Sequence, residues 1–243
     1  MRSIIAVAGI TFLDTLRLPA FRIGSLAFLA ISMLGAVPFS PGIAADPGHY
    51  ADAGVSTLYL GGVFLSFMAV PLLLMSGERG CGISRMLICL PVTKMALILG
   101  MFSGFALPLL LYFVVGGVLQ MSLGTLNPPG LASSTVITCV FRSYMLSLVI
   151  SSIVLFFSQA FSFVAAVAGS LLVVIFGYAA PYLGLPLGLC FPAFYCLDPF
   201  SNQDNSITCL SLKIIHGIIL IFLYIWLASR CVGKTEKRGA LML

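Results

Sequence analysis

The run MALILGMFSGFALPLLLYFVVGGVLQMSL, Met95–Leu123, contains no Asp, Glu, Lys or Arg. About 20 apolar residues in an α-helix cross the hydrocarbon core of a bilayer, which is about 30 Å thick. In lipid the backbone N–H and C=O groups must bond within the segment itself, and a helix achieves this. Met95–Leu123 therefore predicts a transmembrane helix.

The composition of the whole chain agrees with this prediction. The 243 residues are 60% hydrophobic and only 8% charged, and the mean hydropathy is +1.16. A soluble domain of this length could not cover its surface with so few charges. Strands of a membrane β-barrel alternate in polarity over about 10 residues, a pattern that the sequence does not show. We expect an all-α integral membrane protein with a single domain, residues 1–243.

Further apolar runs predict six transmembrane helices in all. The stretch from Leu131 to Tyr182 is too long for one span, and the polar turn near Ser158–Ser162, within FFSQAFS at 156–162, predicts a break between a fourth and a fifth helix. The expected spans are Ile23–Ala45, Val55–Ser76, Met95–Leu123, two helices within Leu131–Tyr182, and Cys209–Ser229. The predicted connections include polar turns at Asp46–Gly54 and Gly124–Gly130, and an outer segment at 183–208 between the last two helices.

The segment Ile4–Arg22 precedes the first expected span. Its apolar residues recur near helical spacing, whereas Asp14, Arg17 and Arg22 are polar. This pattern is typical of an amphipathic helix that lies in the membrane interface. A cleaved signal peptide ending near Ala44–Ala45 is the alternative interpretation, but the apolar segment is long for one.

The basic residues predict the orientation of the chain. Ten of the twelve fall on one side of a six-span protein: Arg2, Arg17, Arg22, Arg79, Arg85, Lys94, Arg230, Lys234, Lys237 and Arg238. Because cytoplasmic loops carry an excess of Lys and Arg, we expect both termini in the cytoplasm. The net charge of +5 follows this topology, so it does not indicate nucleic-acid binding.

Arg142 is a cation within a predicted span, and two interpretations are open. If the fourth helix begins near Arg142, the side chain can snorkel to the outer headgroups. Alternatively, it lies in a water-accessible cavity and contacts an anionic substrate group or a partner at the outer interface.

The cysteines leave a second question open. Cys190, Cys196 and Cys209 lie in or beside the outer segment, where a disulfide among them can form if that face meets an oxidising compartment. Free, buried thiols are the other interpretation. No Cys/His spacing predicts a metal site.

The chain offers no recognisable nucleotide site. Gly233-Lys234-Thr235 matches the end of a P-loop, but the preceding motif glycine is replaced by Ala228 and a membrane helix stands where a strand is needed. The assigned spans also contain no carboxylate, which proton- and sodium-coupled carriers usually need. We therefore expect no enzyme activity and no cofactor in this chain, and an energy source on a partner.

The loop Gly77–Lys94, GERGCGISRMLICLPVTK, is the one charged interruption between two apolar runs. Glu78-Arg79, Gly82, Leu90-Pro91-Val92-Thr93 and Gly100 resemble the cytoplasmic segment of ABC transporter type-2 permeases. The sequence departs from that family's pattern at Ile83 and Met101, where threonine and lysine are common.

The resemblance implies a membrane subunit of an ATP-driven transporter in the cell inner membrane, and it favours export. Cytoplasmic ABC ATPase subunits would bind ATP and Mg, and a second permease copy or a homologue would complete a dimer. The loop 77–94 would contact the ATPase. The coupling residues implied are Glu78, Arg79, Gly82, Arg85, Leu90 and Pro91.

Two alternatives remain beside transport. The same coupling could transmit force to an extracytoplasmic or lipid partner without moving a solute. The loop could also be an ordinary positive-inside loop that binds headgroups, in a membrane enzyme or assembly factor that has no ATPase.

Overall fold

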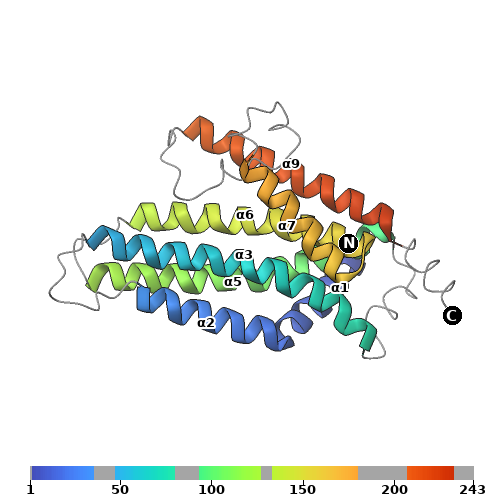
Figure 1. Cartoon of the computed structure of the whole chain (residues 1–243), viewed down its shortest axis with the longest axis horizontal. Coiled ribbons are helices and arrows are strands. Elements are labelled where there is room, and N and C mark those ends of the chain that lie inside the picture. The colour runs from blue at the N-terminus through green and yellow to red at the C-terminus, as the bar shows by residue number, and fades with distance from the viewer. Residues whose placement is uncertain (1, 36–46, 80–92, 127–132, 180–206, 233–243) are drawn as a thin grey trace.

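The computed structural model describes residues 2–35, 47–79, 93–126, 133–179 and 207–232, and these residues form helices without strands. The helices are α1 (Arg2–Arg17), α2 (Pro19–Gly35), α3 (Pro47–Arg79), α5 (Lys94–Leu126), α6 (Ser133–Ala160), α7 (Phe163–Ala179) and α9 (Ile207–Cys231) (Figure 1).

Four of these helices, α3, α5, α6 and α9, are long and apolar enough to cross a membrane. The pair α1–α2 passes the same test only when taken together, as one span bent by 65°. α7 is apolar but only 17 residues long. The described residues thus have the helices of a membrane protein, as the composition predicts, with four or five spans by length.

The break predicted at Ser158–Ser162 is confirmed. α6 ends at Ala160 and α7 begins at Phe163. The backbone carbonyl of Ser162 accepts a hydrogen bond from the amide of Ala166 at 2.8 Å, so Ser162 begins the new helix as its cap.

Three predicted connections are shorter than expected. The turn predicted at Gly124–Gly130 is wrong up to residue 126, because α5 continues to Leu126. The turn predicted at Asp46–Gly54 is wrong from residue 47 onward, because α3 begins at Pro47; proline is well suited to the first helical position. The loop predicted at 77–94 starts later, since α3 continues to Arg79 and α5 begins at Lys94. A single glycine such as Gly77 costs a helix only about 1 kcal/mol and does not have to end it.

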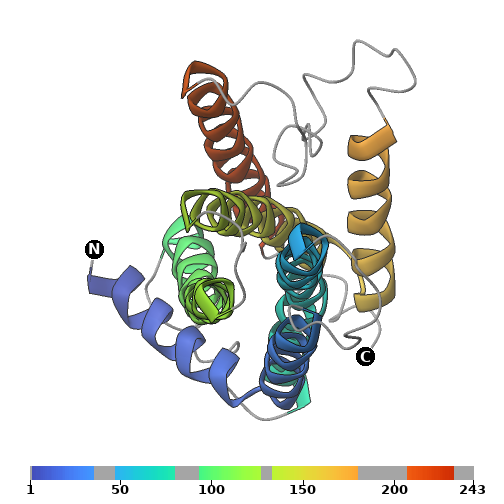
Figure 2. The same ribbon diagram turned by 90° about the vertical axis from the view of Figure 1, so that its left-hand side faces the viewer.

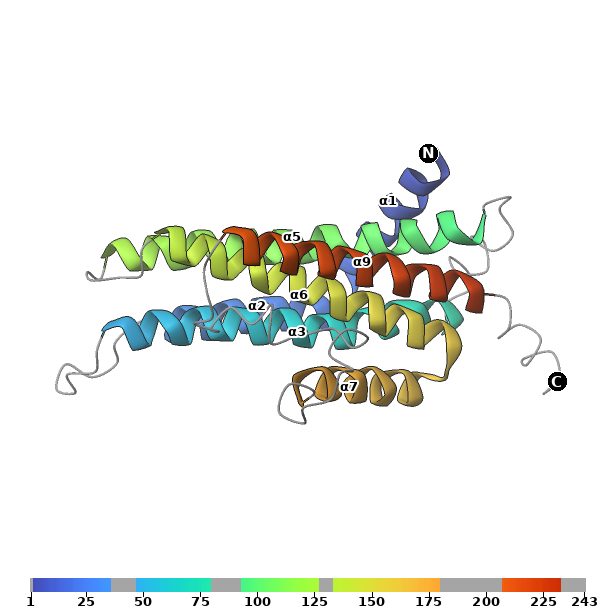
Figure 3. The ribbon, with the colours of Figure 1, turned by 90° about the horizontal axis from the view of Figure 1, so that it is seen from above.

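The N-terminal helix also ends earlier than predicted. α1 stops at Arg17 instead of Arg22, because Pro19 opens α2. The carbonyl of Leu18 accepts the amides of Phe21 and Arg22, both at 3.1 Å, so Leu18 caps α2. The chain turns by 65° at this point, and α1 leaves the side of the bundle (Figure 3). The outer segment predicted at 183–208 likewise overlaps α9, which begins at Ile207.

α6 is the central helix and packs against α3, α5, α7 and α9 (Figure 2). Its buried Ser143, Ser147 and Ser151 recur every four residues and so share one face. Gly62 and Ser66 of α3 meet this face, and the Ser66 hydroxyl donates to the Ser147 carbonyl at 3.2 Å. Small residues on both sides let two membrane helices approach closely.

α1 lies against the first half of α5. A Cβ added to Gly104 would lie 2.5 Å from the carbonyl oxygen of Ala8, and one added to Gly100 would lie 2.6 Å from Cβ of Val7. Gly100 and Gly104 have the small-xxx-small spacing that predicts a close helix contact. The contact is confirmed, and the helix that fills it is α1.

The outer faces of the bundle carry large apolar side chains. Those exposed on α2, α5, α7 and α9 include Leu26, Ile31, Leu107, Leu111, Val114, Val118, Leu172, Ile175, Phe176, Ile219, Phe222 and Leu223. Such a surface would be a liability in water, whereas in a bilayer it faces acyl chains. The lipid bilayer is therefore the environment that fits the described helices.

The α1–α5 contact makes a testable prediction. Gly104→Ala should lower the thermal unfolding midpoint of the purified chain in detergent by about 2–10 °C, because the new methyl meets a backbone oxygen and overpacking costs about 1–3 kcal/mol. Gly9→Ala is the matched control, since a Cβ at Gly9 meets nothing within 4 Å. It should leave the midpoint unchanged or raise it. Equal midpoints for the two variants would show that α1 is not seated on α5 as described.

Candidate functional site

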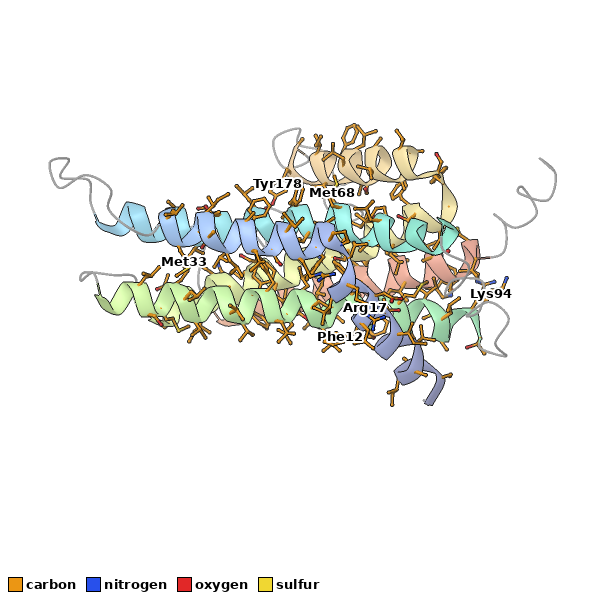
Figure 4. All side chains as sticks on the ribbon, turned by 90° about the horizontal axis from the view of Figure 1, so that it is seen from below. Phe12, Arg17, Met33, Met68, Lys94 and Tyr178 are labelled. Carbon is orange, nitrogen blue, oxygen red and sulfur yellow. The ribbon has the colours of Figure 1, made fainter. Side chains whose placement is uncertain are left out.

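The candidate site is the end of the bundle from which the predicted coupling loop departs. α3 ends and α5 begins there, and α9 ends beside them (Figures 1 and 3). We call this the basic end, because Lys94 and Arg230 lie on it. Figure 4 shows Lys94 at this end and Arg17 in the same half of the molecule, whereas Met33 lies toward the opposite, distal end. Arg17 and Lys94 therefore lie in the same half of the molecule, and the cytoplasmic placement of the ten basic residues stays a prediction.

Two of these cations bond to the carboxyl ends of helices. Lys94 Nζ donates to the carbonyl oxygen of Val232 at 2.8 Å, just beyond the last residue of α9. Arg22 Nη2 donates to the carbonyl oxygen of Arg17, the last residue of α1, at 2.6 Å. A cation at this position satisfies a carbonyl that has no partner within the helix, and it complements the helix dipole.

Arg230 has a different contact. Its guanidinium lies 5.1 Å from the centre of the Trp226 ring, one turn earlier on α9. Trp226 is 47% exposed on the apolar outer face of the helix. Tryptophan and arginine together are typical of the level at which a helix leaves the hydrocarbon core.

A small apolar cluster joins three chain segments at the basic end. Val7 of α1 and Leu97 of α5 are buried together, and Met101 and Val232 pack against them. Together with the Lys94–Val232 hydrogen bond, this cluster ties α1, the start of α5 and the end of α9 to one another. A displacement of the start of α5 would therefore be passed to both other segments.

Most of the predicted coupling residues lie outside the described residues. Glu78 and Arg79 are the last two residues of α3, and their side chains are not described. Gly82, Arg85, Leu90 and Pro91 fall in residues 80–92, outside the described ranges. The structure places the two points where the loop is attached, and the role of the six residues stays a prediction.

The predicted disulfide also lies outside the described residues. Cys190 and Cys196 belong to residues 180–206, and Cys209 is in α9 with a side chain that is not described. Cys231, at the end of α9, is a half-buried thiol. Among the residues that the structure describes, no group of three or more His, Cys, Asp or Glu side chains could hold a metal ion.

Arg142 lies inside the bundle. α6 begins at Ser133, nine residues before Arg142, which at 1.5 Å per residue is about 13 Å along the helix. The side chain is only 5% exposed. The helix does not begin near Arg142, as the snorkelling interpretation supposed; whether the side chain reaches the headgroups stays a prediction. Contact with a substrate or partner remains a prediction.

A buried polar cluster that the sequence did not predict lies at the distal end. Ser32 of α2, Gly54 of α3 and Gln120 of α5 are joined there by hydrogen bonds. Gln120 is 5% exposed and Ser32 is 1% exposed. The one amide side chain within the long apolar run Met95–Leu123 was the available signal, because an amide in a membrane helix needs a partner on a neighbouring helix.

The fold and this arrangement define a class, a helical membrane protein with a basic end and a polar cluster at the distal end. Searches of family models and of curated proteins found no match to the chain. The resemblance of the loop to type-2 permeases therefore rests on the residues quoted for it.

The Lys94 hydrogen bond makes a second prediction. Lys94→Gln should speed amide hydrogen exchange in the last turn of α9, residues 228–232, by about two- to fivefold, the range expected for losing a cation at a helix carboxyl end. Arg22→Gln is the matched control, because it removes the corresponding bond from α1 and should leave α9 unchanged. Mass spectrometry of the chain in lipid discs measures both, and an unchanged last turn in Lys94→Gln would mean that its bond to Val232 contributes nothing.

Proposed function

We propose that this chain is the membrane-spanning subunit of an ATP-driven exporter of the ABC type. It spans the cytoplasmic membrane six times, with both termini in the cytoplasm and α1 in the interface. Two copies, or one copy and a homologue, pair with two cytoplasmic ATPase subunits. The loop between α3 and α5 receives the motion of the ATPases.

The observation that carries this proposal is the motif around the loop. An acidic-basic pair, a glycine, a Leu-Pro-Val-Thr turn and a further glycine follow one another from Glu78 to Gly100 in the family's order. We expect a short helix at Ile83–Leu90 that Pro91 would end, with the charged residues of the loop at the membrane surface.

The geometry of the basic end supports the proposal. The loop is attached to α3 at Arg79 and to α5 near Lys94, and the start of α5 is packed against α1 and bonded to α9. A movement of the loop would therefore be transmitted to α1, α5 and α9. Small shifts at an input site become larger changes when packed helices move as rigid bodies.

The four long spans that the structure describes also lack a carboxylate that could couple transport to an ion gradient. The four long spans in the described ranges, 53–72, 94–123, 134–160 and 214–231, contain no Asp or Glu. Carriers driven by protons or sodium usually place a carboxylate there. An external energy source such as a partner ATPase accounts for a permease without one.

Arg142 belongs to the same proposal as a contact for an anionic group. Its charge lies inside α6, where burying a cation costs about 2.5–3.5 kcal/mol on insertion scales. Charged residues that lie within membrane spans despite this cost are typically part of ion or substrate paths. The non-transporting alternative, transmission of force to an extracytoplasmic or lipid partner, uses the same loop, and no separate observation favours it.

Co-purification from the native membrane tests the proposal. The tagged chain should recover a P-loop ATPase in a ratio near one to one, and Glu78→Ala or Pro91→Ala should lower that recovery at least about tenfold, because a docking contact at a small interface depends on few residues. Asn127→Ala, between α5 and α6 in the sequence and far from the loop at 77–94, is the control and should recover the ATPase in full.

Expression and thermal stability of each variant show whether lost recovery reflects lost docking or lost folding. A chain that purifies alone from the native membrane, with stable variants behaving like the parent, would refute an ABC subunit. An ATPase that is recovered equally by all variants would keep the class of protein and refute the loop as its docking surface.

A further inference from the structure

The polar cluster at the distal end joins three helices with three hydrogen bonds. Ser32 Oγ donates to the carbonyl oxygen of Gly54 at 2.9 Å. Gln120 Nε2 donates to the carbonyl oxygen of Ser32 at 3.0 Å and to Ser32 Oγ at 2.6 Å. α2, α3 and α5 are thus connected through one amide and one hydroxyl.

The space around this cluster fits the amide closely. A Cβ added to Gly54 would lie 2.5 Å from Gln120 Oε1 and 2.7 Å from Nε2. The missing side chain at position 54 is therefore what makes room for Gln120. Both Ser32 and Gln120 are buried, so their hydrogen bonds are shielded from water in this structure.

The cluster lies close to the ends of its helices. Ser32 is three residues from the end of α2, Gln120 is six from the end of α5, and Gly54 is seven from the start of α3. At 1.5 Å per residue these positions are within about 11 Å of the helix ends. Water that entered between these ends as far as the cluster could replace the protein partners of the amide and the hydroxyl.

A different layer lies next to the cluster on the side of the basic end. Phe28 and the Tyr112 hydroxyl fill the space at Gly61, where an added Cβ would lie 2.7 Å from Cβ of Phe28 and closer still to the hydroxyl. Tyr112 also donates to the carbonyl oxygen of Leu58 at 3.2 Å. Aromatic side chains packed this closely would lose contacts if water entered between them. We therefore expect any separation of the three helices to stop at this layer.

We propose that Ser32, Gly54 and Gln120 form a latch that holds the distal ends of α2, α3 and α5 together, and that these ends open and close as one unit down to the Phe28–Tyr112 layer. Hydrogen bonds between membrane helices are worth little net free energy, because the separated groups find other partners. Opening a polar latch therefore costs little free energy, because water can replace its hydrogen bonds. Opening an apolar contact of the same area would cost more, because apolar side chains would be exposed to water.

The role of the latch in transport rests on the proposed function. In an exporter with its ATPases at the basic end, the distal end is the side of release, and the latch would part when ATP drives the bundle open. The existence of the latch does not depend on an ATPase, so the two ideas can fail separately.

Hydrogen exchange of the full chain in lipid discs tests the latch. In Gln120→Leu, which replaces the amide with an apolar side chain of similar size, exchange should rise together in residues 29–34, 54–57 and 116–122. The expected rise is about three- to twentyfold, the range that corresponds to measured hydrogen bonds between membrane helices. Residues 106–113, which lie at the aromatic layer and on its basic-end side, should keep the parent rate.

Two further variants keep the test informative if Gln120→Leu folds poorly. Ser32→Ala removes one hydroxyl, leaves the bond from Gln120 to the Ser32 carbonyl, and should give a smaller rise in the same three segments. Thr57→Val is the matched control, because the Thr57 hydroxyl bonds at 2.8 Å only to the Ala53 carbonyl of its own helix. It should leave α2 and α5 at the parent rate.

The outcomes separate the ideas. Exchange that rises in α5 alone, or in none of the three segments, would refute a common latch. If the segments respond together and an ATPase is recovered, trapping that ATPase with ADP and vanadate should raise exchange in the same segments of the parent complex. If trapping causes no rise in exchange, the latch only holds the helices together, and its role in release is refuted. Failure to recover any ATPase would refute the proposed function and leave the latch result standing.

Discussion

Close approach of helix backbones is the constraint on which the rest of this structure depends. In lipid the helices gain little by hiding apolar side chains from one another, so they associate through packing and a few hydrogen bonds. Gly62 admits Phe113 and Ser147, and Gly104 admits the backbone of α1. At these close contacts in the described residues a glycine or serine is present, and the large apolar residues face outward.

This constraint also explains the two unlike ends of the bundle. At the basic end, cations meet helix carboxyl ends on an exposed surface, as Lys94 does at Val232, and water and salt weaken such contacts. At the distal end, Gln120 bonds inside the bundle to Ser32. A surface contact can be exchanged for a partner protein without opening the bundle, whereas a buried amide can be exchanged only when helices separate. The proposed input at the basic end and the proposed opening at the distal end are consistent with this difference.

The sequence predicted the class of fold because that class depends on local properties. Met95–Leu123 became α5 with small changes at each end, and the polar residues near Ser158 marked the break between α6 and α7. Boundaries were less predictable, since Gly77 and the residues after Asp46 remained helical where a turn was expected. The end of a helix depends on the segments that pack around it, and a glycine or an acidic residue alone does not fix it.

Most contacts between helices could not be predicted from one sequence. The spacing of Gly100 and Gly104 predicted a close contact but could not say that α1 makes it. Gln120 indicated that it needed a partner without identifying Ser32, 88 positions away. Arg142 shows why the difference matters: its charge was evident, yet its burial depends on α6 beginning nine residues earlier, at Ser133. A buried cation in the middle of a helix is costly in any membrane protein. The start of α6 at Ser133 therefore decides whether this charge is buried, and the charge alone did not reveal it.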